Sequence, residues 1–325
     1  MTVALFTLGG TIAMAGTGSG GVVSRLTGAD LTAAVPGLAG IPLDVRDVEA
    51  VPSAALAYRQ ILDLVDAAGA AVADGATGVV VTQGTDTLEE TAFLADLVWP
   101  HPEPLVFTGA MRNPTLAGPD GPANLLAAAR VAAAPAARDL GVLVAFNDEV
   151  HAARFVRKTH STSTATFASP NAGPLGHVIE GAVRLLTRPP RHAPLPPVDR
   201  DRLAATRVAL YTVTLDDDPA LLDALTPGLD GLVVAGFGVG HVPPDFAPAL
   251  GGLAARMPVV LASRTGAGSV LRDTYGAVGS ETDLRRRGLV CGGLLDPYKA
   301  RVLLRMLLAG GADRAAVDAA FARHG

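Results

Sequence analysis

Two threonines and one carboxylate stand in this sequence at positions where reactive groups are often found. Thr11 follows the pair Gly9-Gly10, and the pair Thr85-Asp86 follows Gln83-Gly84. Glycines let the backbone approach a ligand closely, and a hydroxyl beside them can act as a nucleophile. A carboxylate next to a hydroxyl can orient a base or bind a cation. A tight turn or a capped helix without a ligand would explain each segment equally well if it stood alone.

Lysine is rare in this chain, so the position of each lysine is informative. Lys158 and Lys299 are the only two lysines, whereas arginine is abundant. Arginine stays protonated, but a lysine can lose its proton when it is buried and can then act as a base. Lys158 lies in a segment rich in serine and threonine, 151–171, and we predict a functional role for it. Lys299 is expected in the first turn of a helix at 297–309, and we predict that it lies on the surface.

The pattern around these residues predicts an α/β protein whose larger domain has a mostly parallel sheet with helices on both faces. The carboxyl ends of parallel strands lie at one edge of a sheet, where ligands bind in open α/β folds. Thr11, Ser53 and Thr85 all follow expected strands, so they can meet at that edge. The expected strands are 2–8, 44–51, 79–82, 105–108 and 141–147, and the expected helices are 29–35, 57–73, 122–133 and one that begins at 85–87.

A proline-rich segment divides the chain into two domains. Five prolines fall between Leu186 and Leu203, which is typical of a semi-rigid linker. We therefore predict an N-terminal domain at 1–187, a linker at 188–205 and a smaller C-terminal α/β domain at 206–325.

Composition excludes several classes of protein. The net charge is −5 and no basic patch is present, which argues against nucleic acid as a partner. No apolar run approaches the length that spans a membrane, and the N-terminus lacks the basic region of a signal peptide. Cys291 is the only cysteine, so an intrachain disulfide is impossible and a cysteine-based metal site is not expected. These features predict a cytoplasmic location.

The reactive residues would form a nucleophilic site if they converge. An uncharged Lys158 could take the proton of a threonine hydroxyl while Asp86 holds the amine. Backbone N–H groups of the glycines could stabilise an oxyanion.

Several segments resemble those of the bacterial-type L-asparaginases, in the same order along nearly the whole chain. The segments 9–13 (GGTIA) and 83–91 (QGTDTLEET) look like the two signature segments of that family, and together they are highly specific. The pair Lys158-Thr159 and the segments 165–167 (ATF), 173–176 (GPLG) and 292–301 (GGLLDPYKAR) are also similar to it.

The resemblance implies hydrolysis of L-asparagine to aspartate and ammonia through a threonine acyl-enzyme, without a metal or a cofactor. It implies a homotetramer that is a dimer of tight dimers. Thr11 would be the nucleophile, and Thr85, Lys158 and Asp86 a second triad. The substrate would be bound by Gly10, Ser53, Gly84, Thr85 and Asp86 of one subunit and by Glu281 lent from a neighbouring subunit.

Three features of the sequence depart from the family pattern and leave the substrate and the activity open. The loop after Thr11 has no tyrosine, Ala54 stands where a glutamine or glutamate is common, and His241 stands where an asparagine is often found. The chain could therefore act on glutamine or another amide. It could also be a catalytically weak ligand-binding or amidotransferase-type subunit on the same fold.

Overall fold

The computed structural model describes residues 2–16, 22–24 and 27–325 and divides the chain into two compact units. The units are Met1–Leu195 and Pro196–Gly325, and the division falls inside the segment predicted as a linker. That segment also holds helix α5 (Arg200–Ala205), whose N-cap Asp199 accepts a hydrogen bond from the backbone N–H of Arg202.

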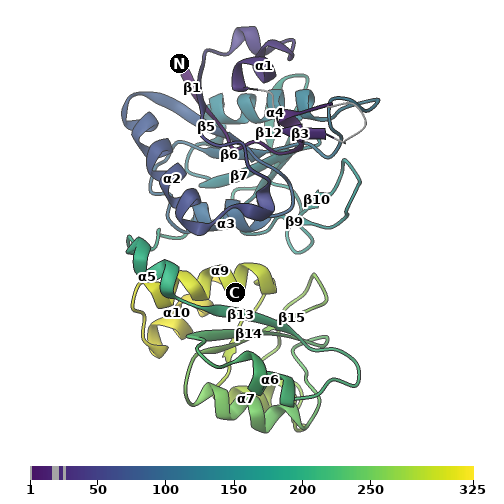
Figure 1. Cartoon of the computed structure of the whole chain (residues 1–325), viewed down its shortest axis with the longest axis vertical. Helices are drawn as coiled ribbons and strands as arrows, with labels where there is room; N and C mark the ends of the chain where they lie inside the picture. The colour runs from purple at the N-terminus through teal and green to yellow at the C-terminus, as the bar shows by residue number, and fades with distance from the viewer. Residues whose placement is uncertain (1, 17–21, 25–26) are drawn as a thin grey trace. The chain divides into compact units, whose positions relative to one another are not determined.

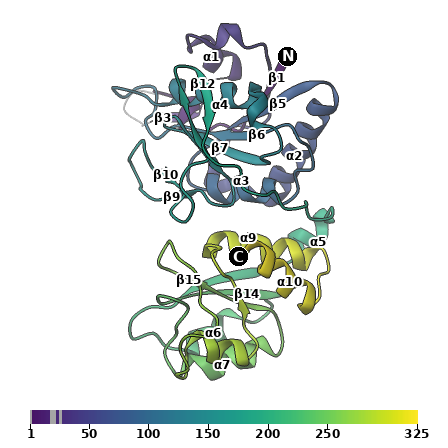
Figure 2. The ribbon, with the colours of Figure 1, turned by 180° about the vertical axis from the view of Figure 1, so that it is seen from behind.

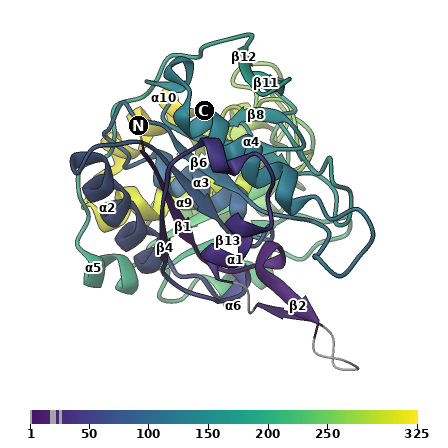
Figure 3. The same ribbon diagram turned by 90° about the horizontal axis from the view of Figure 1, so that it is seen from above.

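The N-terminal unit is built on one eight-stranded sheet (Figure 1). Five adjacent strands, β4, β1, β5, β6 and β7, are parallel, and β8, β11 and β12 add antiparallel strands beyond β7. β12, β11 and β8 lie together at one end of the sheet, away from β4 (Figure 3). In sheet order the strands are β12 (Ala182–Leu185), β11 (Gly176–Ile179), β8 (Glu149–Ala152), β7 (Val142–Phe146), β6 (Leu105–Thr108), β5 (Ala76–Thr82), β1 (Thr2–Thr7) and β4 (Leu43–Asp47).

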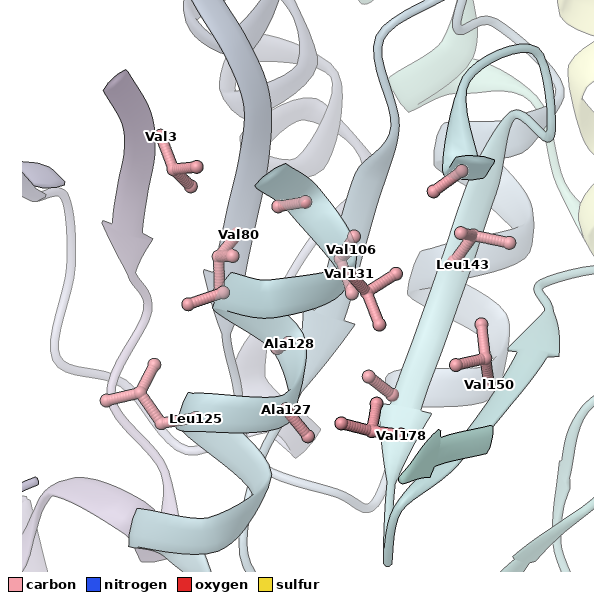
Figure 4. Close-up of a cluster of buried hydrophobic side chains, with 14 of the residues drawn as sticks. Val3, Val80, Val106, Leu125, Ala127, Ala128, Val131, Leu143, Val150 and Val178 are labelled. Atoms are coloured by element: carbon pink, nitrogen blue, oxygen red, sulfur yellow. The ribbon is translucent and has the colours of Figure 1, made fainter. Parts of the chain in front are cut away.

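Helices cover both faces of this sheet, which confirms the predicted architecture. Helices α2 (Tyr58–Ala73) and α3 (Leu88–Asp96) pack on one face, and α1 (Gly28–Ala33) and α4 (Gly121–Ala133) pack on the other. Successive residues of a strand point to opposite faces, so these buried strands are apolar at almost every position. Figure 4 shows Val80, Val106 and Leu143, which are aligned across three strands and pack against α4.

A small hairpin outside the main sheet carries Lys158 (Figure 2). Strands β9 (Arg157–Lys158) and β10 (Phe167–Ala168) pair antiparallel, with Lys158 opposite Phe167. The ring of Phe167 lies 4.8 Å from that of Phe146 at the end of β7, so the hairpin is anchored to the core. A second hairpin joins β2 (Met14–Gly16) and β3 (Val22–Ser24).

The C-terminal unit has a four-stranded parallel sheet in the order β13-β14-β15-β16. In Figures 1 and 2, α9 and α10 lie on one side of it, and α6 and α7 lie on the other. The strands are β13 (Val208–Thr212), β14 (Gly231–Gly236), β15 (Val259–Ser263) and β16 (Val290–Cys291), and the helices are α6 (Ala220–Leu225), α7 (Phe246–Ala254), α8 (Glu281–Arg286), α9 (Pro297–Ala309) and α10 (Arg314–His324).

The structure overturns the predicted surface position of Lys299. This side chain is fully buried, and its Nζ lies 3.6 Å from Oδ2 of Asp296. Asp296 caps α9, so a residue in the first turn of this helix can bury its amine beside a carboxylate. Among the described residues, no helix is both long enough and apolar enough to cross a membrane.

Candidate active site

The ends of β1 and β5 are held together by two glycines. Gly10 has φ +89°, a conformation that side chains disfavour, and a Cβ atom added there would overlap the backbone of Gly84. Thr11 and Thr85 each follow one of these glycines, so their Cα atoms lie within about 4 Å of the contact. The absence of a side chain at Gly10 therefore brings two distant threonines to one place.

Lys158 connects Thr85 to Asp86. Its Nζ donates to Oγ1 of Thr85 at 2.9 Å and to Oδ1 of Asp86 at 2.8 Å. The side chain of Lys158 is 15% exposed, whereas that of Asp86 is 71% exposed. The amine is thus largely shielded, and the carboxylate that holds it faces solvent.

Hydrogen bonds within the β9–β10 hairpin hold Lys158 at that position. The backbone N–H of Thr159 donates to the carbonyl of Thr166 at 2.8 Å. The hydroxyl of Thr166 accepts from the backbone N–H of His160 and donates to the carbonyl of the same residue. Nδ1 of His160 accepts from two backbone N–H groups of the turn. The polar side chains of this segment therefore support the hairpin that carries the amine.

Ser53 lies against the same strand end. It is 3% exposed at the start of the 3-10 helix η4 (Ser53–Ala55), and its Oγ accepts from the backbone N–H of Asp86 at 3.3 Å. A Cβ atom on Gly84 would lie 2.7 Å from that Oγ. The structure thus brings Gly10, Ser53, Gly84, Thr85, Asp86 and Lys158 together, with Thr11 opening the 3-10 helix η1 (Thr11–Ala13) beside them.

Gln83 links these segments and was missed by the sequence analysis as a functional residue. It is fully buried, and its Nε2 donates to Oγ1 of Thr87 at 3.3 Å and to Oγ1 of Thr91 at 3.0 Å. The hydroxyl of Thr87 donates in turn to the carbonyl of Ser53. A polar residue within an otherwise apolar strand end was the available signal.

Asn124 and Asp120 hold the turn after β6, and the sequence analysis did not single out either residue. Asn124 is buried on α4, and its Nδ2 donates to the carbonyl of Gly109 at 3.0 Å. The carboxylate of Asp120 accepts from the backbone N–H groups of Met111 and Arg112. A Cβ atom on Gly109 would lie 3.3 Å from Cγ2 of Thr85, so this turn packs against the Thr85 side chain.

Glu281 and His241 form a polar pair in the C-terminal unit. Oε2 of Glu281 lies 3.2 Å from Nε2 of His241, and Oε1 accepts from the backbone N–H groups of Thr274 and Tyr275. Burial disfavours the charged carboxylate, but the backbone hydrogen bonds from Tyr275 and Thr274 outweigh it and lower the pKa of Glu281. The side chain of Glu281 is fully buried, whereas that of His241 is 37% exposed.

His151 is a buried titratable residue on β8. Its Nδ1 shares a hydrogen bond of 2.9 Å with Oγ of Ser169, and its Nε2 lies 3.1 Å from Oε2 of Glu149. Burial, together with the charge of His177, lowers the pKa of His151 to about 4. The ring is therefore neutral at pH 7.

The arrangement at the end of β5 can support nucleophilic catalysis. A hydroxyl that is hydrogen-bonded to an amine, which a carboxylate orients, has the connectivity of a nucleophile–base–orienter triad. In the described ranges, no cluster of three or more His, Cys, Asp or Glu side chains could hold a metal ion. This architecture and these side chains are typical of α/β enzymes that transfer acyl groups through a hydroxyl.

Comparison with known proteins identifies the family. Residues 2–191 match the family model described as "Asparaginase, N-terminal", and residues 207–321 match "Glutaminase/Asparaginase C-terminal domain". The chain is 36% identical over 319 residues to the probable L-asparaginase of Deinococcus radiodurans, covering 96% of this chain and 94% of that one. It is 39% identical over 242 residues to L-asparaginase 2 of Escherichia coli, covering 72% and 67%.

A solved structure agrees with these matches. The probable cytoplasmic L-asparaginase of Campylobacter jejuni superposes with a TM-score of 0.87 at 31% identity and covers 99% of both chains. The chain belongs to the asparaginase family.

Proposed function

We propose that this protein hydrolyses L-asparagine to L-aspartate and ammonia. The observation that carries the proposal is the position of Lys158, whose Nζ is hydrogen-bonded to both Thr85 and Asp86. The names of the relatives, L-asparaginase in Deinococcus radiodurans and in Escherichia coli, support the same substrate.

The reaction divides into two acyl transfers. Oγ1 of Thr11 attacks the carboxamide carbon, the C–N bond breaks, and the nitrogen leaves as ammonia after it takes up the hydroxyl proton. A water molecule then attacks the resulting ester and gives a proton to the Thr85–Lys158 pair. As the ester C–O bond breaks, this proton passes to Oγ1 of Thr11, which restores the hydroxyl and releases aspartate. Backbone N–H groups near Gly10 and Gly84 stabilise the oxyanion of each tetrahedral intermediate.

The groups around the triad suit the two charged ends of an amino acid. The carboxylate of Asp86 is 71% exposed and can bind the α-ammonium group. The hydroxyl of Ser53 accepts from a backbone N–H and can still donate to the α-carboxylate. Glu281 of a second copy adds a negative charge near the ammonium group. The carboxylate is fully buried and His241, which contacts it, is partly exposed, so we expect the imidazole ring to face the substrate.

That contribution requires an oligomer. We expect a homotetramer that is a dimer of tight dimers, in which each site takes Glu281 from a neighbouring subunit. The protein acts in the cytoplasm, as does the neighbour from Campylobacter jejuni according to its name.

Replacing each threonine separately tests the proposal. Thr11→Ala and Thr85→Ala should each lower kcat for ammonia release from asparagine by about 10³-fold or more, because loss of one member of a catalytic unit removes most of its effect. Thr226→Ala, in the C-terminal unit, is the matched control and should leave kcat unchanged. Turnover at the control rate in either site variant would refute the assignment.

Ala54 supports a second candidate, an amidohydrolase acting on glutamine or another amide. This residue is exposed in η4 directly after Ser53, where a methyl group leaves more space than a glutamine would. Packing against one additional methylene discriminates by only about 10- to 200-fold. Values of kcat/KM for asparagine, glutamine and other amides, measured side by side, identify the preferred substrate. Binding of aspartate without hydrolysis of any amide would instead indicate a ligand-binding subunit.

A further inference from the structure

A cavity of about 760 Å³ in the C-terminal unit is lined by residues that carry positive charge. It lies among α8, β16 and α10 and shares no lining residue with the candidate active site or with the His241–Glu281 pair. Its charged lining residues are Arg272, Arg285, Arg286, Arg314, Asp273 and Asp318. The whole chain has a net charge of −5, whereas the lining of this cavity is net positive.

Two of the four arginines are fixed by the backbone. Nη1 of Arg285 donates to the carbonyl of Arg272 at 2.7 Å and to Oδ1 of Asp273 at 3.0 Å. Arg314 donates to the carbonyls of Ala254 and Gly288. A guanidinium has five N–H donors, so each of these groups keeps donors for a ligand. Because their side chains are already ordered, binding would cost little conformational entropy.

Gly288 locates one of these charges at the cavity wall. This lining residue has φ +96°, and a Cβ atom added to it would lie 3.2 Å from Nη2 of Arg314. The guanidinium of Arg314 therefore lies directly over the backbone that forms the wall.

The other two arginines are not fixed by a direct contact, although the charge of Arg286 helps to lower the pKa of Asp283, to which Arg287 is bound. Neither Arg272 nor Arg286 makes a side-chain hydrogen bond or an ion pair in the described part of the chain, and both side chains are exposed. Their charges are therefore not neutralised by direct contact with a carboxylate, in contrast to Arg285, which pairs with Asp273.

We infer that this cavity binds a small organic phosphate. Four guanidiniums against two carboxylates leave an excess of two positive charges, which matches the charge of about −1.5 to −2 on a phosphate monoester at pH 7. Guanidinium forks fit phosphate oxygens in pairs. The volume lies within the range of small-molecule sites, which leaves room for an organic group. An apolar wall for that group is supplied by Leu289, Val290, Ala319 and Ala322.

Titration calorimetry with phenyl phosphate, inorganic phosphate and benzoate at constant ionic strength tests this inference. We expect saturable binding of phenyl phosphate that is tighter than that of the other two. Arg272→Ala and Arg286→Ala should each weaken it by about tenfold or more, because each removes a charge-assisted contact. Arg256→Ala removes an exposed arginine of the same unit outside the cavity and should not change the affinity.

Three results would overturn the inference. Equal affinity in Arg256→Ala and in the two cavity variants would place the phosphate elsewhere. Benzoate or inorganic phosphate binding as tightly as phenyl phosphate would remove the assignment to an organic phosphate. A change of oligomeric mass in the cavity variants, with no phosphate binding to the parent protein, would identify the surface as a contact between copies. The titration contains no asparagine, so its failure leaves the proposed hydrolysis untouched.

Discussion

The carboxyl ends of the parallel strands are built alike in the two units but hold their polar groups differently. Each edge carries a glycine-rich turn, at Gly9-Gly10 after β1 and at 236–240 after β14. In the N-terminal unit, Lys158 is bound by the side chains of Thr85 and Asp86. In the C-terminal unit, two backbone N–H groups and His241 bind the fully buried Glu281.

We call the end of β5, with Thr85, Asp86 and Lys158, the reactive edge, because its side chains can exchange hydrogen bonds with a substrate. We call the end of β14, with His241 and Glu281, the presenting edge, because Glu281 can contribute only its negative charge. Hydrogen bonds between side chains can be exchanged for bonds to a substrate, and Asp86 is exposed enough to take part. The carboxylate of Glu281 is instead fully buried and accepts hydrogen bonds from two backbone N–H groups. The edge of a parallel sheet therefore brings polar side chains together, and the hydrogen-bond partners of each side chain determine whether it can react with a substrate.

The largest effect is expected at Lys158, and it tests the reactive edge. Lys158→Met should lower kcat by about 10³-fold or more, because it removes the base. Lys158→Arg keeps a positive charge and donors towards Asp86 but cannot be deprotonated, so it should lose a similar amount of activity. Ammonia release and the melting temperature should be measured for both variants. Activity of the arginine variant within tenfold of the parent would show that the amine acts only by its charge.

His151 tests whether a titratable group away from the edge affects stability rather than rate. The unfolded residue has a pKa of 6.5 and the folded one about 4, so between these values the unfolded chain binds a proton that the folded chain does not. The contribution is fully present above pH 6.5 and falls by about 3 kcal/mol as the pH approaches 4. Urea unfolding at several pH values measures it.

The variant His151→Gln isolates this effect from other titrating groups. Its free energy of unfolding should fall less steeply than that of the parent between pH 6.5 and 4, while kcat at pH 7.5 stays within a few-fold. Parallel pH profiles for the two proteins would contradict a buried neutral imidazole.

Glu281 gives the smallest expected effect and tests the presenting edge. Glu281→Gln keeps the shape of the side chain but removes its charge, and the hydrogen bonds from Thr274 and Tyr275 weaken. The free energy of unfolding should fall by about 2 kcal/mol. KM for asparagine should rise more than kcat falls, because the charge acts on binding. A fall in kcat with no change in KM would contradict this and would indicate that Glu281 takes part in the reaction itself.

Strand periodicity and strand ends predicted the main features of the N-terminal unit. The apolar runs at β1 and β5 made a parallel sheet predictable, and the glycines after them located Thr11 and Thr85 at one edge. The scarcity of lysine singled out Lys158, which the structure places against Thr85.

Contacts between residues far apart in sequence could not be predicted in this way. Lys299 looked like a surface residue because helix position alone does not reveal that its amine is buried beside Asp296. Gln83 stood out only as a polar residue after an apolar strand, and its role depends on its hydrogen bonds to Thr87, the N-cap of α3, and to Thr91 in the first turn of that helix. Helix α8 lies in a segment rich in glycine and polar residues, where the capping by Ser280 becomes visible only from coordinates.

The anchoring of the β9–β10 hairpin has a practical consequence. Lys158 belongs to a two-residue strand outside the main sheet, which contacts the rest of the unit through the ring of Phe167 and through the hydrogen bonds of Lys158 to Thr85 and Asp86. Short segments with few neighbours open at a lower free energy than the surrounding core. Heat should therefore inactivate the enzyme at temperatures where the sheet is still intact, and efforts to extend its working lifetime should begin at this hairpin rather than in the interior.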